Sequence, residues 1–162
     1  MCATSTGGGT VVLDEDGAGR DFAHLWQLPL GACKEGMDKR VAVLTASFAH
    51  RFGVNGLALD ADDCLLATGS DDATACIWEL GSLPPTLRAT CHHSSFVWEV
   101  SMAAQLGLLA TASEDGQAAL FHLSTGAMLA TFAFDAGCCE VAIDPVSNVL
   151  LASSADGTVR VW

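Results

Sequence analysis

The chain has 162 residues, 51% of them hydrophobic and only 16% charged, which excludes an intrinsically disordered protein and is enough for one domain with a core. Its 7 Lys and Arg against 19 Asp and Glu give a formal net charge of −12. Because phosphates are bound chiefly by basic side chains, this charge disfavours direct binding to nucleic acid or to an anionic membrane, and other proteins or basic peptides are the expected partners.

The sequence gives no sign of membrane insertion or secretion. No apolar run approaches the ~20 residues of a membrane-spanning helix, and residues 1–10 lack the basic and apolar regions of a signal peptide. We expect an intracellular, cytoplasmic protein, with the nucleus as the alternative. The seven cysteines are odd in number, and Cys64, Cys76 and Cys138 stand where a strand takes a small apolar residue, so we expect free thiols in a reducing compartment.

The first quarter of the chain is the least regular part. Residues 1–40 are expected to form an irregular N-terminal segment that contains a degenerate partial repeat. Within it, residues 22–28 alternate weakly like a strand and end near Trp26, but Arg20 stands where the later repeats have an Asp. Residues 41–48 are predicted to be a strand that closes this first unit.

From Val54 onward a regular repeat is visible. A predicted β-hairpin over residues 65–80 joins two strand-like runs through an acidic turn, and it returns over residues 108–123 and 150–162. The turn aspartates are spaced by 43 and then 41 residues. The recurring positions are a serine, a turn aspartate and an aromatic residue six positions later: Ser70, Asp72 and Trp78; Ser113, Asp115 and Phe121; Ser154, Asp156 and Trp162.

A strand-rich repeat with a period of roughly 40–45 residues is typical of a propeller array. The predicted fold is therefore all-β, built of β-propeller blades that are four-stranded antiparallel sheets. The expected blades cover residues 49–91, 92–134 and 135–162, and the last lacks its fourth strand. With so few blades, we expect an incomplete or partial propeller that depends on self-association, a further chain segment or a partner.

Three motifs, LATGSDDATACIW, LATASEDGQAALF and LASSADGTVRVW, resemble the WD-repeat family of β-propellers over roughly residues 41–162. The chain departs from the family pattern where Glu79 follows Trp78 and His122 follows Phe121, since the family has Asp there. The resemblance implies a rigid scaffold that binds proteins, without catalysis or cofactor. The alternatives are purely structural blades of a larger propeller or complex and, less favoured, a hydrolase-like propeller enzyme.

The resemblance also implies a buried network in each blade that runs from a His through a strand Ser and a turn Asp to a Trp. Such a network lets each buried polar group satisfy another. The match is complete in one blade, shorter in the next because Phe121 replaces Trp, and shorter still in the last, where Phe134 and Asp135 stand in the neighbourhood of the His. The residues assigned to the network are His50, Ser70, Asp72 and Trp78; His93, Ser113 and Asp115; Ser154, Asp156 and Trp162.

The recurrent polar residues could in principle form a catalytic site or a metal site. Ser, His and Asp invite a hydrolase, but a catalytic serine needs an exposed nucleophile and an oxyanion hole, whereas this serine recurs once per repeat. The cysteines and histidines at 91–93 and 138–139 fit no zinc spacing. We therefore expect neither catalytic residues nor a metal site.

Partner binding is expected at positions that the network leaves unused. In the family, the residue before the first strand, the second residue of that strand and the residue before the turn Asp lie on the top face. By register these are Gly53, Asn55 and Asp71; Phe96, Trp98 and Glu114; Gly137, Cys139 and Ala155. Phe96 and Trp98 flank Val97, so both should point away from the core if Val97 points inward.

The predicted binding residues are therefore an aromatic pair with an acidic rim: Phe96, Trp98, Asp71, Glu114 and Asn55. The alternative is that Phe96 or Trp98 packs under a neighbouring blade.

Overall fold

The computed structural model describes residues 9–15, 21–27 and 43–162. These residues form fourteen strands in four antiparallel sheets, with one short 3-10 helix, Ala104–Leu106. The strands are β1 (Gly9–Glu15), β2 (Asp21–Gln27) and β3 (Val43–Ala49); β4 (Val54–Asp60), β5 (Leu65–Ser70), β6 (Thr74–Glu79) and β7 (Thr86–His92); β8 (Val97–Ala103), β9 (Leu108–Ser113), β10 (Gln117–His122) and β11 (Met128–Ala133); β12 (Cys138–Asp144), β13 (Val149–Ser154) and β14 (Val159–Val161). No helix in the described residues is long and apolar enough to span a bilayer.

Two of the hairpins seen in the sequence form the middle of a four-stranded sheet, and the third, formed by β13 and β14, makes up one side of the last sheet. Strands β5 and β6 pair in antiparallel register with Leu66 opposite Trp78, and Leu109 lies opposite Phe121 at the same place in β9 and β10. The turn between them needs one left-handed residue, which Ala73 supplies in one hairpin with φ 66° and Gly116 in the next with φ 81°. Turn chemistry and strand alternation thus place the recurrent residues identically in successive sheets.

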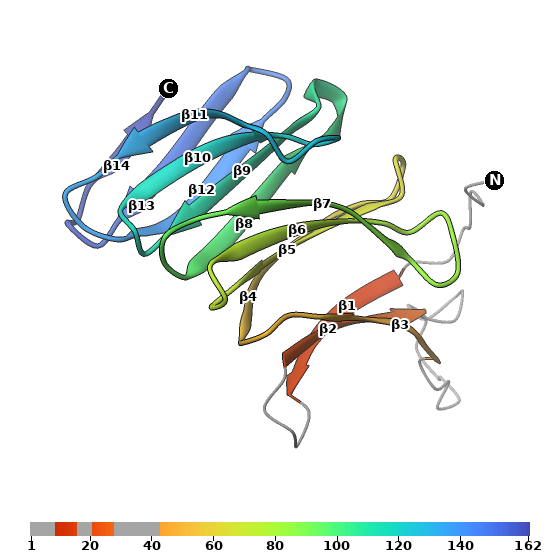
Figure 1. Cartoon of the computed structure of the whole chain (residues 1–162). Helices are drawn as coiled ribbons and strands as arrows, with labels where there is room; N and C mark the ends of the chain where they lie inside the picture. Colours follow the sequence, from red (N-terminus) through yellow and green to blue (C-terminus); the bar gives the residue numbers. More distant parts are fainter. Residues whose placement is uncertain (1–8, 16–20, 28–42) are drawn as a thin grey trace, which may run out of the picture.

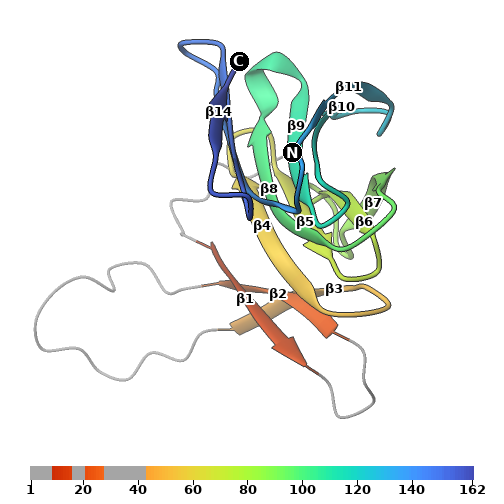
Figure 2. The ribbon, with the colours of Figure 1, turned by 90° about the vertical axis from the view of Figure 1, so that its left-hand side faces the viewer.

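The sheets stack face to face, with the first strand of each nearest its neighbours (Figures 1 and 2). Strand β8 packs alongside both β4 and β12. One core cluster, which includes Ile77, Val97 and Phe121, fills the space between the second and third sheets. A second cluster, which includes Ala118 and Leu150, lies between the third and fourth. Each sheet is therefore a blade stabilised mainly by apolar burial against the adjacent blades.

The architecture of antiparallel propeller blades predicted from the sequence is confirmed, and the last sheet has three strands. Within residues 1–40, expected to be an irregular segment with a degenerate partial repeat, the structure describes two strands. Strand β2 falls on the weakly alternating segment 22–28, and β1, which the sequence analysis did not identify, pairs with it; β3 completes a three-stranded sheet. The apolar centre of β1 is only Val11–Leu13, too short to stand out as a pattern.

The cysteines differ from expectation at one position. Cys76, Cys91, Cys138 and Cys139 are free, but Cys64 is disulfide-bonded, so the prediction of free thiols is wrong for it. Cys64 lies in the turn before β5 with φ 54°, outside any strand. Burial raises the pKa of the Cys91 thiol to about 12 and that of Cys138 to about 11, which keeps both protonated and unreactive at neutral pH.

Candidate protein-binding face

A chain of hydrogen bonds runs through the second sheet from Trp78 to Asp72. The indole Nε1 of Trp78 donates to Thr68 Oγ1 at 3.0 Å, and this hydroxyl lies 2.7 Å from Nε2 of His50. On its other side the His50 ring contacts Asp72 Oδ2 through Nδ1 at 3.0 Å. An indole N–H can only donate and an ionised carboxylate can only accept. The neutral imidazole with its proton on Nδ1 therefore satisfies every member of the chain.

The hydroxyl in this chain belongs to Thr68, so the assignment of Ser70 to that position is wrong. Ser70 Oγ instead donates to the Phe52 carbonyl at 3.1 Å and accepts the Asp72 backbone N–H at 3.1 Å. The two residues share a face of β5, but Ser70 lies two positions farther toward the turn. Its role is to hold the turn.

The third sheet repeats this arrangement without the indole. His93 contacts Thr111 Oγ1 at 2.7 Å and Asp115 Oδ2 at 2.9 Å, while Phe121 meets the imidazole edge to face at 5.7 Å. The same correction applies here, because Ser113 bonds to the Ser95 carbonyl and to the Asp115 N–H. The prediction that Phe121 shortens the network matches this geometry.

The fourth sheet replaces the polar chain with aromatic contacts. Phe134 and Ala152 stand at the positions of His and Thr, and the Trp162 ring packs 4.6 Å from Phe132 and 5.9 Å from Phe134. Ser154 and Asp156 keep the turn contacts of the other blades. The serine that holds the turn is thus present in all three of these blades, whereas the threonine is present only in the two blades that have the histidine.

The geometry does not support the hydrolase reading. Ser70 and Ser113 do not touch the imidazoles, and the hydroxyls that do, on Thr68 and Thr111, are fully buried. An acyl-transfer nucleophile has to reach substrate. Nor do three or more potential metal-ligating side chains gather anywhere in the described residues.

The predicted binding positions are shaped by a β-bulge in the first strand of the second, third and fourth sheets. The pairing with the second strand shifts between Val54 and Gly56, between Val97 and Glu99, and between Cys138 and Glu140. Asn55, Trp98 and Cys139 are therefore the bulged residues. A bulge leaves its extra residue outside the ladder and re-aims the side chain.

The bulge residues meet the residues that precede the turn aspartates. The Asp71 N–H donates to the Gly53 carbonyl at 2.8 Å, and the Glu114 N–H donates to the Phe96 carbonyl at 2.9 Å. Asn55 Nδ2 then donates to Asp71 Oδ1 at 2.7 Å. The same amide group reaches across to the third blade, where it lies 3.1 Å from the Val97 carbonyl.

In the third blade the aromatic pair is held open to solvent. Trp98 Nε1 donates to Glu114 Oε2 at 2.7 Å, and the rings of Phe96 and Trp98 meet edge to face at 6.0 Å. Phe96 is 44% exposed and Trp98 37%, while Val97 between them is fully buried. Asn55, Asp71, Phe96, Trp98 and Glu114 thus form one connected surface across two blades, which we call the upper band.

The sequence analysis missed two features of this surface. Phe52, next to Gly53, is half-exposed and lies under the Arg51 guanidinium at 5.4 Å. Gly137 faces Glu114 so closely that a Cβ there would lie 2.7 Å from Oε2. No pattern in the sequence reports either contact, because both depend on the approach of neighbouring loops.

Acid should destabilise the two histidine networks. Burial alone would raise the pKa of the Asp115 carboxyl, but hydrogen bonds from the Ser94 N–H and His93 outweigh it and hold that pKa below its ordinary value; Asp72 is lowered in the same way by Thr74, Arg51 and His50. A carboxyl whose pKa is lowered on folding stabilises the protein above its unfolded pKa of ~3.9, and this contribution is lost as the pH falls through the folded value.

We therefore expect urea midpoints to fall below about pH 4, and the fall to be smaller in the doubly substituted Asp72→Asn/Asp115→Asn protein. Asp62→Asn, at an exposed turn position, should keep the wild-type profile. Parallel profiles for the wild-type and double-variant proteins would contradict the assignment.

Comparisons with known proteins agree with this fold. The family described as WD domain, G-beta repeat, matches residues 39–79 and 126–162. The chain is 36% identical over 102 residues to WD repeat-containing protein 1 of Rattus norvegicus, covering 60% of this chain and 16% of that protein. It is 30% identical over 164 residues to COMPASS component SWD3 of Saccharomyces cerevisiae, covering 88% of this chain and 51% of that protein. The chain thus spans about half or less of the length of these relatives.

Solved structures show the same architecture. The WD40 β-propeller domain of Doa1 superposes with a TM-score of 0.67 at 19% identity, over 95% of this chain and 47% of that one. The computationally designed Ika4 protein gives 0.66 at 16% identity, over 99% of this chain and 93% of that one. Repeats matched in two places, relatives named for WD repeats and the propeller fold together show that the chain belongs to the WD-repeat family of β-propeller proteins.

Proposed function

We propose that this protein is a non-catalytic scaffold that binds Lys- or Arg-rich segments of other proteins on the upper band. The observation that carries the proposal is the exposed Phe96 and Trp98 pair, fixed in place by the bond from Trp98 to Glu114. Exposed aromatic anchors in a rigid setting are typical of binding hot spots.

The charge of the surface favours a basic partner. Asp71 and Glu114 flank the aromatic pair, and the whole chain carries a formal charge of −12. Trp and Tyr faces also attract cations, so a Lys or Arg near Trp98 gains both from the ring and from Glu114. One relative is named as a component of COMPASS, which supports binding to other proteins in general.

Binding can be tested with a fluorescent peptide that carries three arginines around one leucine, measured by anisotropy. Trp98→Ala should weaken binding by at least about tenfold, as for a hot-spot residue. Trp98→Phe keeps a ring but loses the bond to Glu114, so it should lie in between. The control is Val146→Ala, since Val146 is 88% exposed in a turn remote from the band.

The contribution of the acidic residues to binding can be measured separately, from association rates and from the dependence of affinity on salt. Asp71→Asn with Glu114→Gln should mainly slow association, and wild-type affinity should fall with salt because exposed charges are screened beyond ~8 Å at physiological ionic strength. If peptide affinity is unchanged both by Trp98→Ala and by added salt, the proposal is overturned and purely structural blades are favoured.

A further inference from the structure

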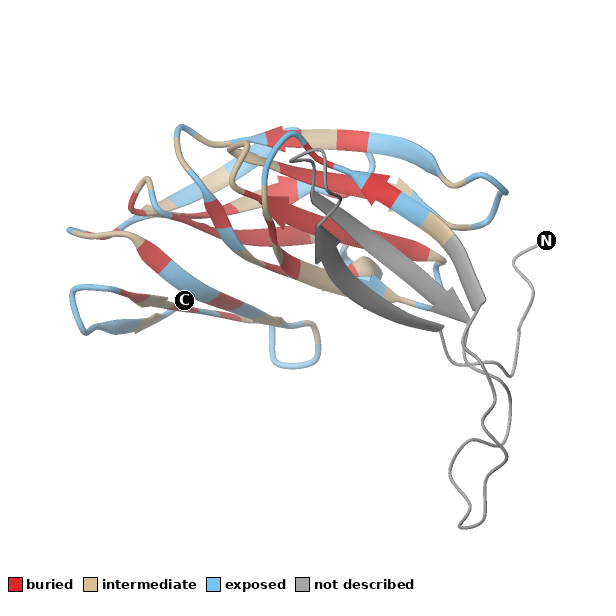
Figure 3. Ribbon diagram, turned by 90° about the horizontal axis from the view of Figure 1, so that it is seen from below, coloured by how far each residue is buried: buried red, intermediate tan, exposed pale blue. Residues whose placement is uncertain are grey.

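A small cavity lies between the second and third sheets, at the end of the strands opposite the upper band. Its volume is about 220 Å³, and it is lined by residues of β7 and of the turns that follow β4, β8 and β10. The upper band, in contrast, lies where β4 and β8 begin. The polar turn residues of the cavity are exposed, as are most turns at the ends of the sheets (Figure 3). A ligand can therefore reach it from solvent.

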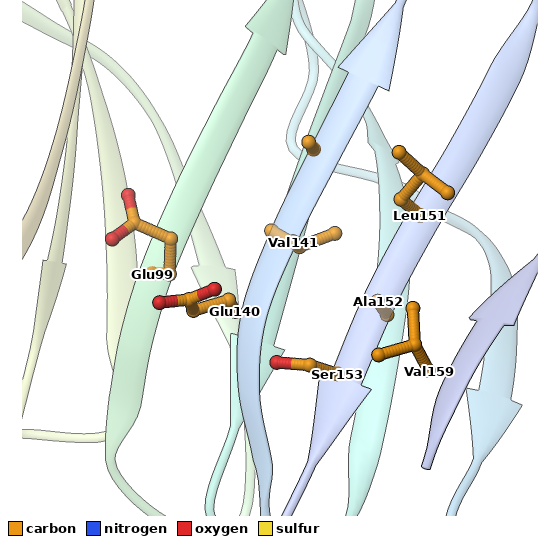
Figure 4. A pocket seen from close by; sticks show the side chains of 8 residues that line it. Glu99, Glu140, Val141, Leu151, Ala152, Ser153 and Val159 are labelled. Carbon is orange, nitrogen blue, oxygen red and sulfur yellow. The ribbon is translucent and has the colours of Figure 1, made fainter.

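A larger cavity of about 370 Å³ is a different kind of feature. It lies beside Glu99 and Glu140 and is also lined by Leu151 and Val159 of the last sheet (Figure 4). In the second and third sheets, the corresponding face is covered by the next blade. We assign no ligand to this larger cavity.

A bulge in β7 places Arg88 in the smaller cavity. The pairing of β6 with β7 shifts between Ile77 and Trp78, and Arg88 is the residue left outside the ladder. A bulge re-aims the side chain of its extra residue. Within the described residues, the one ion pair of Arg88 is with Glu79, at 3.5 Å. A guanidinium group has five N–H donors, so this single contact leaves most of them for a ligand.

His122 contributes a further donor to the same cavity. The Ser124 N–H donates to His122 Nδ1 at 3.2 Å, and Ser124 Oγ lies 2.9 Å from the same atom. Because a backbone N–H can only donate, Nδ1 carries no proton and the N–H of the neutral ring is on Nε2. His122 and Glu79 are also the two positions where the chain departs from the aromatic–Asp pattern of its family, and both departures meet at this cavity.

The cavity also has an acidic group and an apolar floor. Asp63 lies in the turn before β5, and within the described part of the chain its carboxylate forms no ion pair, with Arg88 or with any other base. Leu65 and Leu123 belong to the core cluster between the two sheets, so they close the cavity on its inner side. A guanidinium, an N–H donor, a carboxylate and an apolar surface thus line one small volume.

We propose that this cavity binds a free α-amino acid with an apolar side chain. The α-carboxylate lies against the Arg88 guanidinium and the His122 Nε2–H, since charge-assisted bonds of this kind are the strong ones. The α-ammonium lies against Asp63, and the side chain lies on Leu65 and Leu123.

Size and charge favour this class over other ligands. The volume is below the ~300–1,000 Å³ of pockets for drug-sized molecules, so the ligand is smaller than these. A zwitterion has no net charge, whereas the formal charge of −12 on the chain would repel a phosphate or a dicarboxylate. The end of a peptide would carry one charge of the pair and leave either Arg88 or Asp63 without a counterpart.

The test uses the full chain and L-leucine as the probe, titrated by ligand-observed NMR. N-acetyl-L-leucine lacks the ammonium and L-leucinamide lacks the carboxylate, so each should bind at least about tenfold more weakly than L-leucine. If either derivative binds as tightly as L-leucine, the site takes a peptide end and the proposal is overturned. Absence of L-leucine binding up to about 10 mM overturns it as well.

Protein variants locate the two charged contacts. Arg88→Gln should weaken L-leucine at least about tenfold but leave L-leucinamide unchanged, and Asp63→Asn should weaken L-leucine but leave N-acetyl-L-leucine unchanged. Arg51→Gln and Asp62→Asn make the same changes outside the cavity and should have no effect. Equal losses in these controls would overturn the proposal. Trp98→Ala should leave L-leucine binding unchanged, so failure here and failure at the upper band are distinguishable.

Discussion

Thr68→Val should lower the free energy of unfolding by ~2–4 kcal/mol, although the two side chains have nearly the same shape. The hydroxyl of Thr68 accepts the Trp78 N–H and contacts His50 Nε2, and all of this side chain is buried. Valine would leave the indole donor and the imidazole nitrogen without their partner, and each unsatisfied buried group costs ~1–3 kcal/mol. Urea denaturation gives the difference from the shift in midpoint, provided the slope is unchanged.

The third blade provides the matched control. Thr111→Val removes the hydroxyl beside His93, but Phe121 has no donor to lose, so it should cost about half as much as Thr68→Val. Ser70→Ala should cost ~1 kcal/mol, since Ser70 holds only the turn.

A double-mutant cycle sharpens the comparison. With Trp78→Phe already present, the second blade resembles the third, and Thr68→Val should then cost about as much as Thr111→Val. If Ser70→Ala costs more than Thr68→Val, the hydrogen-bond chain is assigned to the wrong hydroxyl.

The mistaken choice of Ser70 over Thr68 shows how much of the hydrogen-bond network can be predicted from the sequence. Alternation along β5 puts both hydroxyls on one face, so the pattern predicts that a strand hydroxyl meets the histidine but not which one. Recurrence in all blades favoured the serine. The better signal was joint occurrence: threonine accompanies histidine in two blades, and in the last, Ala152 and Phe134 replace both.

The upper band was predictable in part. Phe96 and Trp98 point outward because Val97 between them is buried, which alternation alone predicts. The bulges that free Asn55 and Trp98 were not predictable, since a bulge is defined by the register of the partner strand. The bond from Asn55 to the Val97 carbonyl joins residues 42 positions apart, so it depends on how two blades pack.

Because the second and third blades pack so closely, Gly56→Ala should also lower the free energy of unfolding strongly. A Cβ on Gly56 would lie 2.9 Å from Glu99 Cα, 3.0 Å from Val100 N and 3.1 Å from the Trp98 carbonyl oxygen. All three are backbone atoms, so no side-chain rotation relieves the contact and β4 has to move away from β8. We expect a loss of ~2–3 kcal/mol in unfolding free energy, in the upper range for overpacking.

Two glycines of the same blade separate this contact from the general effect of adding a methyl group. Gly69→Ala would meet Val97 Cγ1 at 2.9 Å and Val100 Cγ1 at 3.2 Å, which are side-chain methyl groups that can shift, so it should cost ~1 kcal/mol. Gly81→Ala meets nothing within 4 Å and should be neutral or slightly stabilising, since it only restricts the unfolded chain.

The displacement caused by Gly56→Ala should also reach the binding surface. Moving β4 from β8 lengthens the bond from Asn55 to the Val97 carbonyl, which tethers the segment that contains Phe96 and Trp98 to the second blade. Peptide affinity at the upper band should therefore fall in Gly56→Ala and not in Gly69→Ala, measured below the unfolding transition of both. If Gly56→Ala proves no more costly than Gly81→Ala, the first strands do not approach as closely as the structure shows, and the tether across the two blades loses its basis.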